Sequence, residues 1–226
     1  MSTGQRRSHV LASSNAQGKQ SSLHGLPQPP YSLIGRKKDL EAVQDLILRG
    51  NVRLVTITGP PGVGKTRFAV ELASTVGSEF DNGVVFVDLV PVRDPGLVLD
   101  VIARALGVVE HPDRPSLARL QRHLRGRNVL LLLDNFEQVV AAASGVADLL
   151  AACPDVKVLV TSRQPLHLRW EHRYNLPPLV LPGAMARSDQ GTLARYPATA
   201  LFIERARAAE KQFSLNERNA ATVVEI

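Results

Sequence analysis

The chain of 226 residues is long enough for one ordinary domain with a substantial core and part of a second domain. Hydrophobic residues make up 44% of it and aromatic residues 4%, which favours an aliphatic sheet-and-helix interior and excludes a fibrous or wholly disordered chain. A single cysteine, Cys153, rules out an internal disulfide and indicates a reducing compartment, so we expect a cytoplasmic protein. We also expect neither secretion nor a membrane anchor, because no apolar run approaches the roughly 18 residues that a membrane span needs.

Half of the net charge of +6 belongs to the first 30 residues, which contain Arg6, Arg7 and Lys19 and no acidic residue. The rest of the chain carries 24 basic and 21 acidic residues, a near-balance that is typical of a solvated surface. We therefore expect no direct nucleic-acid binding from this segment. Residues 1–30 are rich in Ser, Gln and Gly, which predicts a disordered tail. The alternative is an organelle transit peptide, but the amphipathic periodicity of such peptides is missing.

Hydrophobic periodicity and turn residues predict alternating helices and strands. Near-continuous apolar strands separated by amphipathic helices are typical of a parallel sheet that is covered by helices on both faces. In chain order we predict a helix ending near Gly50, a strand over 53–58, a helix from about Lys65, a strand over 84–87, helices over 95–106 and 116–124, a strand over 129–133, a helix over 139–152, a strand over 156–161 and a short strand over 174–176.

The pattern changes after residue 181. Residues 182–197 contain Gly, Ser, Asp and Gln without periodicity, which predicts a linker between a domain over residues 31–181 and the segment 198–226. A helix is predicted from Ala198 to Ala209, and Ser214 is a candidate N-cap for a helix that begins near Glu217. Because that helix reaches residue 226 without a capping signal, we expect residues 198–226 to be the truncated start of a helical domain.

The most informative motif lies directly after the strand predicted over residues 53–58. It reads Gly-Pro-Pro-Gly-Val-Gly-Lys-Thr and fills every position of the phosphate-binding loop pattern Gly-x-x-x-x-Gly-Lys-Ser/Thr. Glycines let successive backbone N–H groups turn towards an anion, and the next helix adds the positive end of its dipole. The alternative is a turn that merely links strand to helix. The predicted nucleotide site comprises Gly59, Pro60, Pro61, Gly62, Val63, Gly64, Lys65, Thr66 and Arg67.

Four side chains are candidates for chemistry. Lys65 is expected to reach the terminal phosphates, and Thr66 to offer its hydroxyl to Mg²⁺. Asp134 ends an apolar strand on the same edge of a parallel sheet as the phosphate loop, so it is the predicted magnesium-orienting acid, with a helix N-cap as the alternative. Arg163 follows the strand over 156–161 and would emerge beside the terminal phosphate if that strand lies between the other two; otherwise it is a surface arginine.

The residues after Asp134 bear on hydrolysis. Asn135 stands where many hydrolytic phosphate-loop proteins carry an acid, and an amide cannot take a proton from attacking water. Hydrolysis is therefore expected to be slow or to use another residue. Glu137 is either a substitute base or an acid that suits the dipole of a helix first turn. Asp88, which ends an earlier strand, either contacts water or magnesium or forms a turn.

Together these motifs resemble the signal-transduction ATPases of the STAND class, in particular the NB-ARC or AP-ATPase group of plant resistance proteins, apoptosis activators and large bacterial transcription regulators. The resemblance covers about residues 33–226. It implies the three-layer α/β sandwich of P-loop NTPases, with a parallel sheet and the start of a helical domain. Ile34, Gly35 and Arg36 lie in a segment that resembles the motif bordering adenine and ribose, and residues 161–163 resemble the sensor motif, which implies that Arg163 contacts the γ-phosphate.

The resemblance also implies a function. ADP would hold a closed state, ATP with Mg²⁺ would favour an open or oligomeric one, and slow hydrolysis, with Lys65, Asp134 and Arg163 as the catalytic set, would reset the switch. The group's Gly-Leu-Pro-Leu motif has no counterpart in this stretch, so homo-oligomer or partner-protein contacts are expected through domains outside it. Two alternatives stay open: another P-loop enzyme, such as a small-molecule kinase or a mechanical ATPase, and a nucleotide-binding module without turnover.

Overall fold

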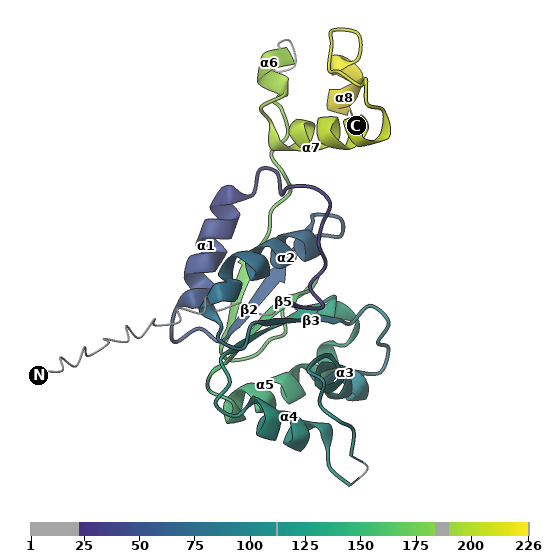
Figure 1. The fold of residues 1–226 in the computed structure, drawn as a ribbon. Helices are drawn as coiled ribbons and strands as arrows, with labels where there is room; N and C mark the ends of the chain where they lie inside the picture. The colour runs from purple at the N-terminus through teal and green to yellow at the C-terminus, as the bar shows by residue number, and fades with distance from the viewer. Residues whose placement is uncertain (1–22, 112, 184–189, 226) are drawn as a thin grey trace, which may run out of the picture.

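The computed structural model describes residues 23–111, 113–183 and 190–225. Within these residues one parallel sheet of six strands forms the centre of the molecule, in the order β1-β3-β4-β5-β2-β6 (Figure 1). Apolar runs in the sequence form its central strands because both faces of the sheet are buried. The strands are β1 Leu23–His24, β2 Leu54–Thr58, β3 Val84–Asp88, β4 Val129–Asp134, β5 Val156–Thr161 and β6 Glu171–Asn175.

Helices cover both faces of the sheet. Helices α1 and α2 lie on one face and α3, α4 and α5 on the other, whereas α6, α7 and α8 lie beyond one end of the sheet (Figure 1). No helix within the described residues is long and apolar enough to cross a membrane. The helices are α1 Lys37–Leu48, α2 Lys65–Val76, α3 Val98–Ala105, α4 Ser116–Leu124, α5 Ala143–Ala152, α6 Gln190–Leu193, α7 Pro197–Ala209 and α8 Ala220–Glu225, with 3₁₀ turns at Gly77–Glu79, Pro95–Leu97, Phe136–Gln138 and Val140–Ala142.

Strand β5 lies between β4 and β2, although it comes after both in the chain. Leu54 at the start of β2 pairs with Val158 of β5 on one side and with Glu171 of β6 on the other. Because all the strands are parallel, the carboxyl ends of β2, β4 and β5 share one edge of the sheet. This strand order meets the condition on which Arg163 was predicted to emerge near the phosphate loop.

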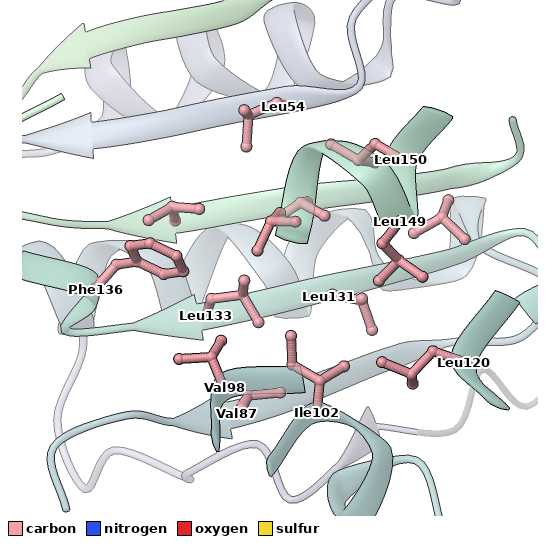
Figure 2. Packing of buried hydrophobic residues seen from close by; sticks show 14 of the residues in the cluster. Leu54, Val87, Val98, Ile102, Leu120, Leu131, Leu133, Phe136, Leu149 and Leu150 are labelled. Atoms are coloured by element: carbon pink, nitrogen blue, oxygen red, sulfur yellow. The ribbon is translucent and has the colours of Figure 1, made fainter. Parts of the chain in front are cut away.

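Alternate residues of β4 pack into two separate hydrophobic cores, one on each face of the sheet. Leu131 and Leu133 pack against α3, α4 and α5, together with Ile102 from α3 and Leu149 from α5 (Figure 2). Leu130 and Leu132 point to the other face and pack in the cluster that includes Phe68 of α2. All of these side chains are buried. Burial on both faces explains why β4 is an unbroken apolar run and carries no alternating pattern.

Two predicted helices begin with 3₁₀ turns. Residues 95–97 form one such turn before α3, and residues 140–142 form another before α5. Asp94 precedes the first of these turns, where its side chain accepts a hydrogen bond from the backbone N–H of Gly96 at 2.8 Å, as the predicted cap requires. The last strand was predicted over 174–176 but occupies 171–175, because its register is set by pairing with β2 from Leu54 onwards.

The predicted N-cap at Ser214 is wrong. Helix α8 begins at Ala220, later than the predicted start near Glu217. The backbone oxygen of Ser214 accepts hydrogen bonds from the side-chain amides of Asn216 and Asn219, at 3.2 and 2.9 Å. Asparagine side chains that bond to nearby backbone favour a turn over a helix, which delays the start of α8 by several residues.

Two further predictions fall partly outside the described residues. Of the tail predicted as disordered over residues 1–30, residues 1–22 lie outside them, and Leu23–His24 forms strand β1, which pairs with Val84 and Val85 of β3. Of the linker predicted over 182–197, residues 184–189 lie outside them, and the short helix α6 occupies 190–193. Two residues of pairing are too few for a strand pattern to be visible in a sequence.

Candidate functional site

The loop between β2 and α2 depends on its glycines. Gly59, Gly62 and Gly64 have φ angles of 150°, 77° and 91°, which L-residues rarely adopt. A Cβ atom on Gly59 would also lie 2.8 Å from the backbone oxygen of Leu176. The glycines of the motif are therefore needed to shape the loop that leads into α2.

Helix α2 begins at Lys65, and its N-cap, Gly64, has no side chain to cap the first turn. The first backbone N–H groups of a helix have no partner within the helix, and the helix dipole makes this end favourable for an anion. The Lys65 ammonium donates hydrogen bonds to the backbone oxygens of Gly59 and Pro60, at 3.0 and 3.2 Å. The structure thus places the positive charge of Lys65 across the loop, as a phosphate site requires.

Asp134 lies at the carboxyl end of β4, opposite the first turn of α2. The hydroxyl of Thr66 lies 2.9 and 3.0 Å from its two carboxylate oxygens, and the hydroxyl of Thr161 on β5 also donates to it. Asp134 is only 3% exposed. Burial raises the pKa of this carboxyl, the hydrogen bonds from Thr161 and Thr66 oppose that rise, and the nearby charges of Asp88 and Glu137 add to it.

This donor set fits Mg²⁺, which prefers hard oxygen ligands and keeps several waters. Thr66 and Asp134 supply a hydroxyl and a carboxylate within hydrogen-bonding distance of each other. In the described part of the chain no three His, Cys, Asp or Glu side chains gather as a metal cage. A magnesium ion at Thr66 and Asp134 would therefore take its other ligands from phosphate oxygens and water.

Arg163 and Glu137 lie on the same edge of the sheet and contact each other. The Arg163 Nε atom donates a hydrogen bond to Glu137 Oε1 at 3.1 Å. Asn135, between Asp134 and the 3₁₀ turn, has a φ of 61° and donates from its side-chain amide to Asp134 at 3.1 Å. Asp88 accepts a hydrogen bond from the backbone N–H of Val90 at 2.9 Å, which is the turn that we gave as one of its two roles.

A pocket of about 470 Å³ lies beside the phosphate loop. Its walls come from residues 32–34 and Arg36, from the loop, from residues that follow β6 and from α7, and they include the apolar side chains of Leu33, Ile34, Leu179 and Leu201. Arg36 also lines it; this residue is 4% exposed, and its guanidinium donates to the backbone oxygen of Val63 at 3.2 Å. Both the size and the mostly apolar lining are typical of small-molecule sites.

The segment before α1, residues 31–36, contacts the helices on both sides of this pocket. A Cβ atom on Gly35, whose φ is 70°, would lie 2.3 Å from Cβ of Pro197, the first residue of α7. The Tyr31 backbone oxygen accepts a hydrogen bond from Arg67 of α2 at 2.7 Å, and the guanidinium of Arg205 lies 4.3 Å from the Tyr31 ring centroid. Residues 31–36 thus contact both α2 and α7.

A family model described as an AAA domain matches residues 48–168, which include the phosphate loop, Asp134 and Arg163. The chain belongs to the AAA domain family. This chain is 38% identical over 175 residues to a Mycobacterium tuberculosis protein named as an HTH-type transcriptional regulator. It is 37% identical over 123 residues to the regulatory protein AfsR of Streptomyces griseus.

The two alignments cover 77% and 50% of this chain but only 18% and 12% of the respective relatives. The chain thus spans less than a fifth of the regulators that it matches. Among solved structures, this chain is similar to the ORC2 protein of Aeropyrum pernix, determined as ADPNP and ADP complexes, with a TM-score of 0.56 and 17% identity over 87% of this chain and 69% of that one. This likeness shows the α/β fold of P-loop NTPases.

Three contacts beside the site had no counterpart in the predictions. The Tyr174 hydroxyl donates to Asp39 at 2.6 Å, and Asp39 lies 3.3 Å from the guanidinium of Arg36. The Tyr174 ring stacks on Phe68 of α2 with a centroid distance of 6.3 Å. Arg36 and Asp39 are three residues apart at the start of α1, but no spacing in the sequence links Tyr174 to Asp39 or to Phe68. Thr161 belonged to a predicted motif, and only the strand order could show that its hydroxyl reaches Asp134.

Proposed function

We propose that this AAA domain binds ATP and ADP with Mg²⁺ and acts as a nucleotide-dependent switch of the STAND class, in the NB-ARC or AP-ATPase group. The contact between Thr66 and Asp134 at the mouth of the phosphate loop is the observation that carries the proposal. A hydroxyl at the start of α2 and a buried carboxylate at the end of β4 form the ligand pair that a nucleotide-bound magnesium ion needs.

In the proposed complex the loop from Gly59 to Thr66 surrounds the phosphates with its backbone N–H groups. Lys65 exchanges its contacts with the Gly59 and Pro60 oxygens for contacts with the terminal phosphates, and Arg67 lies in the same first turn of α2. Ile34, Gly35 and Arg36 border the adenine and ribose, at the pocket that residues 32–34 and Arg36 share with α7. A bound Mg²⁺ ion neutralises charge on the phosphate oxygens.

The proposed switch depends on the pocket beside the phosphate loop, which is lined by residues before α1 and by α7. We assign residues 31–181 to a nucleotide-binding domain, residues 182–197 to a linker and residues 198–226 to the start of a helical domain. A nucleotide in this pocket contacts elements from both domains. ATP and ADP differ by the γ-phosphate, so they can favour different arrangements only through groups that contact it, and Lys65 and Arg163 are the cations that we assign to it.

The regulatory role that we propose rests on the relatives. The relatives named as regulators supply the context for a role in signal transduction and transcription regulation, and the chain covers 18% of the first of them. We place such a regulator in the cytoplasm, and we assign its homo-oligomer or partner-protein contacts to other parts of the protein.

A nucleotide-binding module without turnover is the second candidate, and Asn135 favours it. The amide of Asn135 hydrogen-bonds to Asp134 and cannot act as a base. The two candidates differ only in whether bound ATP is cleaved, so a binding measurement tests what they share.

The decisive experiment is to measure the nucleotide released from the heat-denatured protein and the affinity for ATP and ADP with Mg²⁺. Lys65→Ala should weaken ATP binding by about 10- to 100-fold, because it removes a charge-assisted contact that is roughly twice as strong as a neutral one. Lys37→Ala is the matched control, since the Lys37 side chain is 90% exposed on α1 and lies outside the site. Binding that is equal in the parental protein and Lys65→Ala, or absent from both, would contradict the proposal.

A further inference from the structure

Arg163 and Glu137 come from the ends of two neighbouring central strands. Arg163 follows β5 by two residues, and Glu137 lies in the 3₁₀ turn Phe136–Gln138 that follows β4. Their side chains meet at 3.1 Å, but they differ sharply in exposure: the Arg163 side chain is 62% exposed and that of Glu137 is 13% exposed. The carboxylate is therefore held by the fold, whereas the guanidinium has room to move.

The second oxygen of Glu137 is buried and has no hydrogen-bond partner among the described residues. A buried carboxylate oxygen without a partner costs free energy, so this pair is not arranged for stability alone. Glu137 lies in the turn that directly follows Asp134 at the end of β4, so the two carboxylates share the magnesium-site edge of the sheet, in keeping with the rise that the charge of Glu137 adds to the pKa of Asp134. The second oxygen of Glu137 can therefore accept a further hydrogen bond or a proton beside the predicted phosphate site.

The other polar groups at this edge of the sheet either already accept hydrogen bonds or cannot act as a base. The Asp88 carboxylate accepts the backbone N–H of Val90, and Asp134 accepts the hydroxyls of Thr66 and Thr161. Asn135 has no basic group. Of the acids near Asp134, Glu137 alone has one oxygen paired with a movable cation and the other oxygen without a partner in the described structure.

We propose that Glu137 is the proton acceptor for ATP hydrolysis and that Arg163 restrains it until a γ-phosphate draws the guanidinium away. This inference rests on the proposed nucleotide site. In the step, the water oxygen forms a bond to the γ-phosphorus, the bond from that phosphorus to the β–γ bridging oxygen breaks, and the water proton passes to Glu137 as ADP leaves. A γ-phosphate carries more charge than one carboxylate and accepts both arms of a guanidinium, so it competes for Arg163.

The test combines single-turnover hydrolysis of ATP with the affinities for ATP and ADP, all with Mg²⁺ and the full chain. Glu137→Gln keeps the size of the side chain and removes its basicity, so hydrolysis should slow by about 100-fold or more. Because the variant also frees Arg163 from its ionic partner, the preference for ATP over ADP should rise about two- to five-fold, the size expected for a partly exposed ion pair. A purely structural role would change both affinities equally.

Glu110→Gln is the matched control, because Glu110 forms an exposed pair with Arg104 at 3.2 Å and takes no part in the proposed site. It should leave hydrolysis and the ATP-to-ADP preference unchanged. Normal nucleotide binding with hydrolysis in Glu137→Gln within about three-fold of the parental rate would overturn this inference and leave the nucleotide site intact. Absence of nucleotide binding from the parental protein would overturn the proposed function, and the inference with it.

Discussion

The hydroxyl of Thr66 lies 2.9 and 3.0 Å from the two carboxylate oxygens of Asp134, although 68 residues separate them in the chain. The contact joins the first turn of α2 to the end of β4. It brings the phosphate loop and the acidic strand into one site before any ligand is considered. A side chain at position 66 must therefore satisfy two demands: it must fit against Asp134, and it must offer an oxygen to a metal.

The first prediction separates these demands. Thr66→Ala should weaken the magnesium-dependent part of ATP binding by about 10- to 100-fold, because the variant removes one oxygen ligand and one hydrogen bond to the other ligand. Thr66→Ser keeps the hydroxyl and should retain most of the magnesium effect. The measurement is ATP affinity with Mg²⁺ and with a chelator. Equal magnesium dependence in the alanine and serine variants would rule out a role for the Thr66 oxygen.

The second prediction concerns Tyr174, whose pKa is raised to about 12 by burial first and then by its hydrogen bond to Asp39. A raised pKa means that the folded state favours the neutral phenol. The stabilisation is therefore fully present below the ordinary tyrosine pKa of about 10, and it is lost as the pH rises from there to about 12. Tyr174→Phe should remove this loss, which makes its stability less sensitive to pH in that window.

Phenolate absorbance checks the same point directly. The chain has three tyrosines. The titration of the parental protein minus that of Tyr174→Phe should isolate one group with a midpoint near 12. A difference curve centred near the ordinary value of about 10 would show that the contact with Asp39 does not persist in solution.

The third prediction tests the contact between Gly35 and α7. Gly35→Ala should destabilise the fold by about 1–3 kcal/mol, because the residue has a φ of 70° and the new Cβ would lie 2.3 Å from Cβ of Pro197. Gly50→Ala is the matched control, since nothing lies within 4 Å of its Cβ position, and it should change stability by less than about 0.5 kcal/mol. Denaturant unfolding of both variants provides the comparison. Similar small effects would mean that residue 35 and α7 are not packed together.

The fourth prediction concerns the core beneath β4. Leu131→Ala should lower the free energy of unfolding by about 3–5 kcal/mol, because Leu131 is fully buried and its loss leaves a cavity between the sheet and helices α3 to α5. Val109→Ala, at a side chain that is 83% exposed, should have almost no effect. Thermal or denaturant unfolding gives both values. A small loss for Leu131→Ala would indicate that this part of the core is loosely packed.

The sequence was sufficient to predict the sheet-and-helix class, because strands buried on both faces leave long apolar runs such as residues 129–133. It also predicted the phosphate loop, since the φ angles of Gly59, Gly62 and Gly64 require glycine. These features depend on local chemistry. The roles of the predicted site residues stay predictions until nucleotide binding is measured.

Other features depend on contacts between distant segments, which a single sequence does not record. The position of β5 between β4 and β2 decides that Thr161 reaches Asp134 and that Arg163 meets Glu137. The edge strand β1 is only two residues long, and the late start of α8 reflects competing asparagine hydrogen bonds. In each case tertiary or side-chain contacts override the local pattern.

The position of β2 in the sheet also bears on how the protein emerges from the ribosome. The strand that leads into the phosphate loop is made early, yet its two partners are residues 156–161 and 171–175. At about 5–20 residues per second, translation takes on the order of 10 s to pass from the end of β2 to the end of β6. Until β5 has been made, both edges of this buried strand lack their native partners. Helices α1 and α2 are made before β5, so they can cover the face of β2 that carries Val55 and Ile57 while its two edges stay open to non-native pairing.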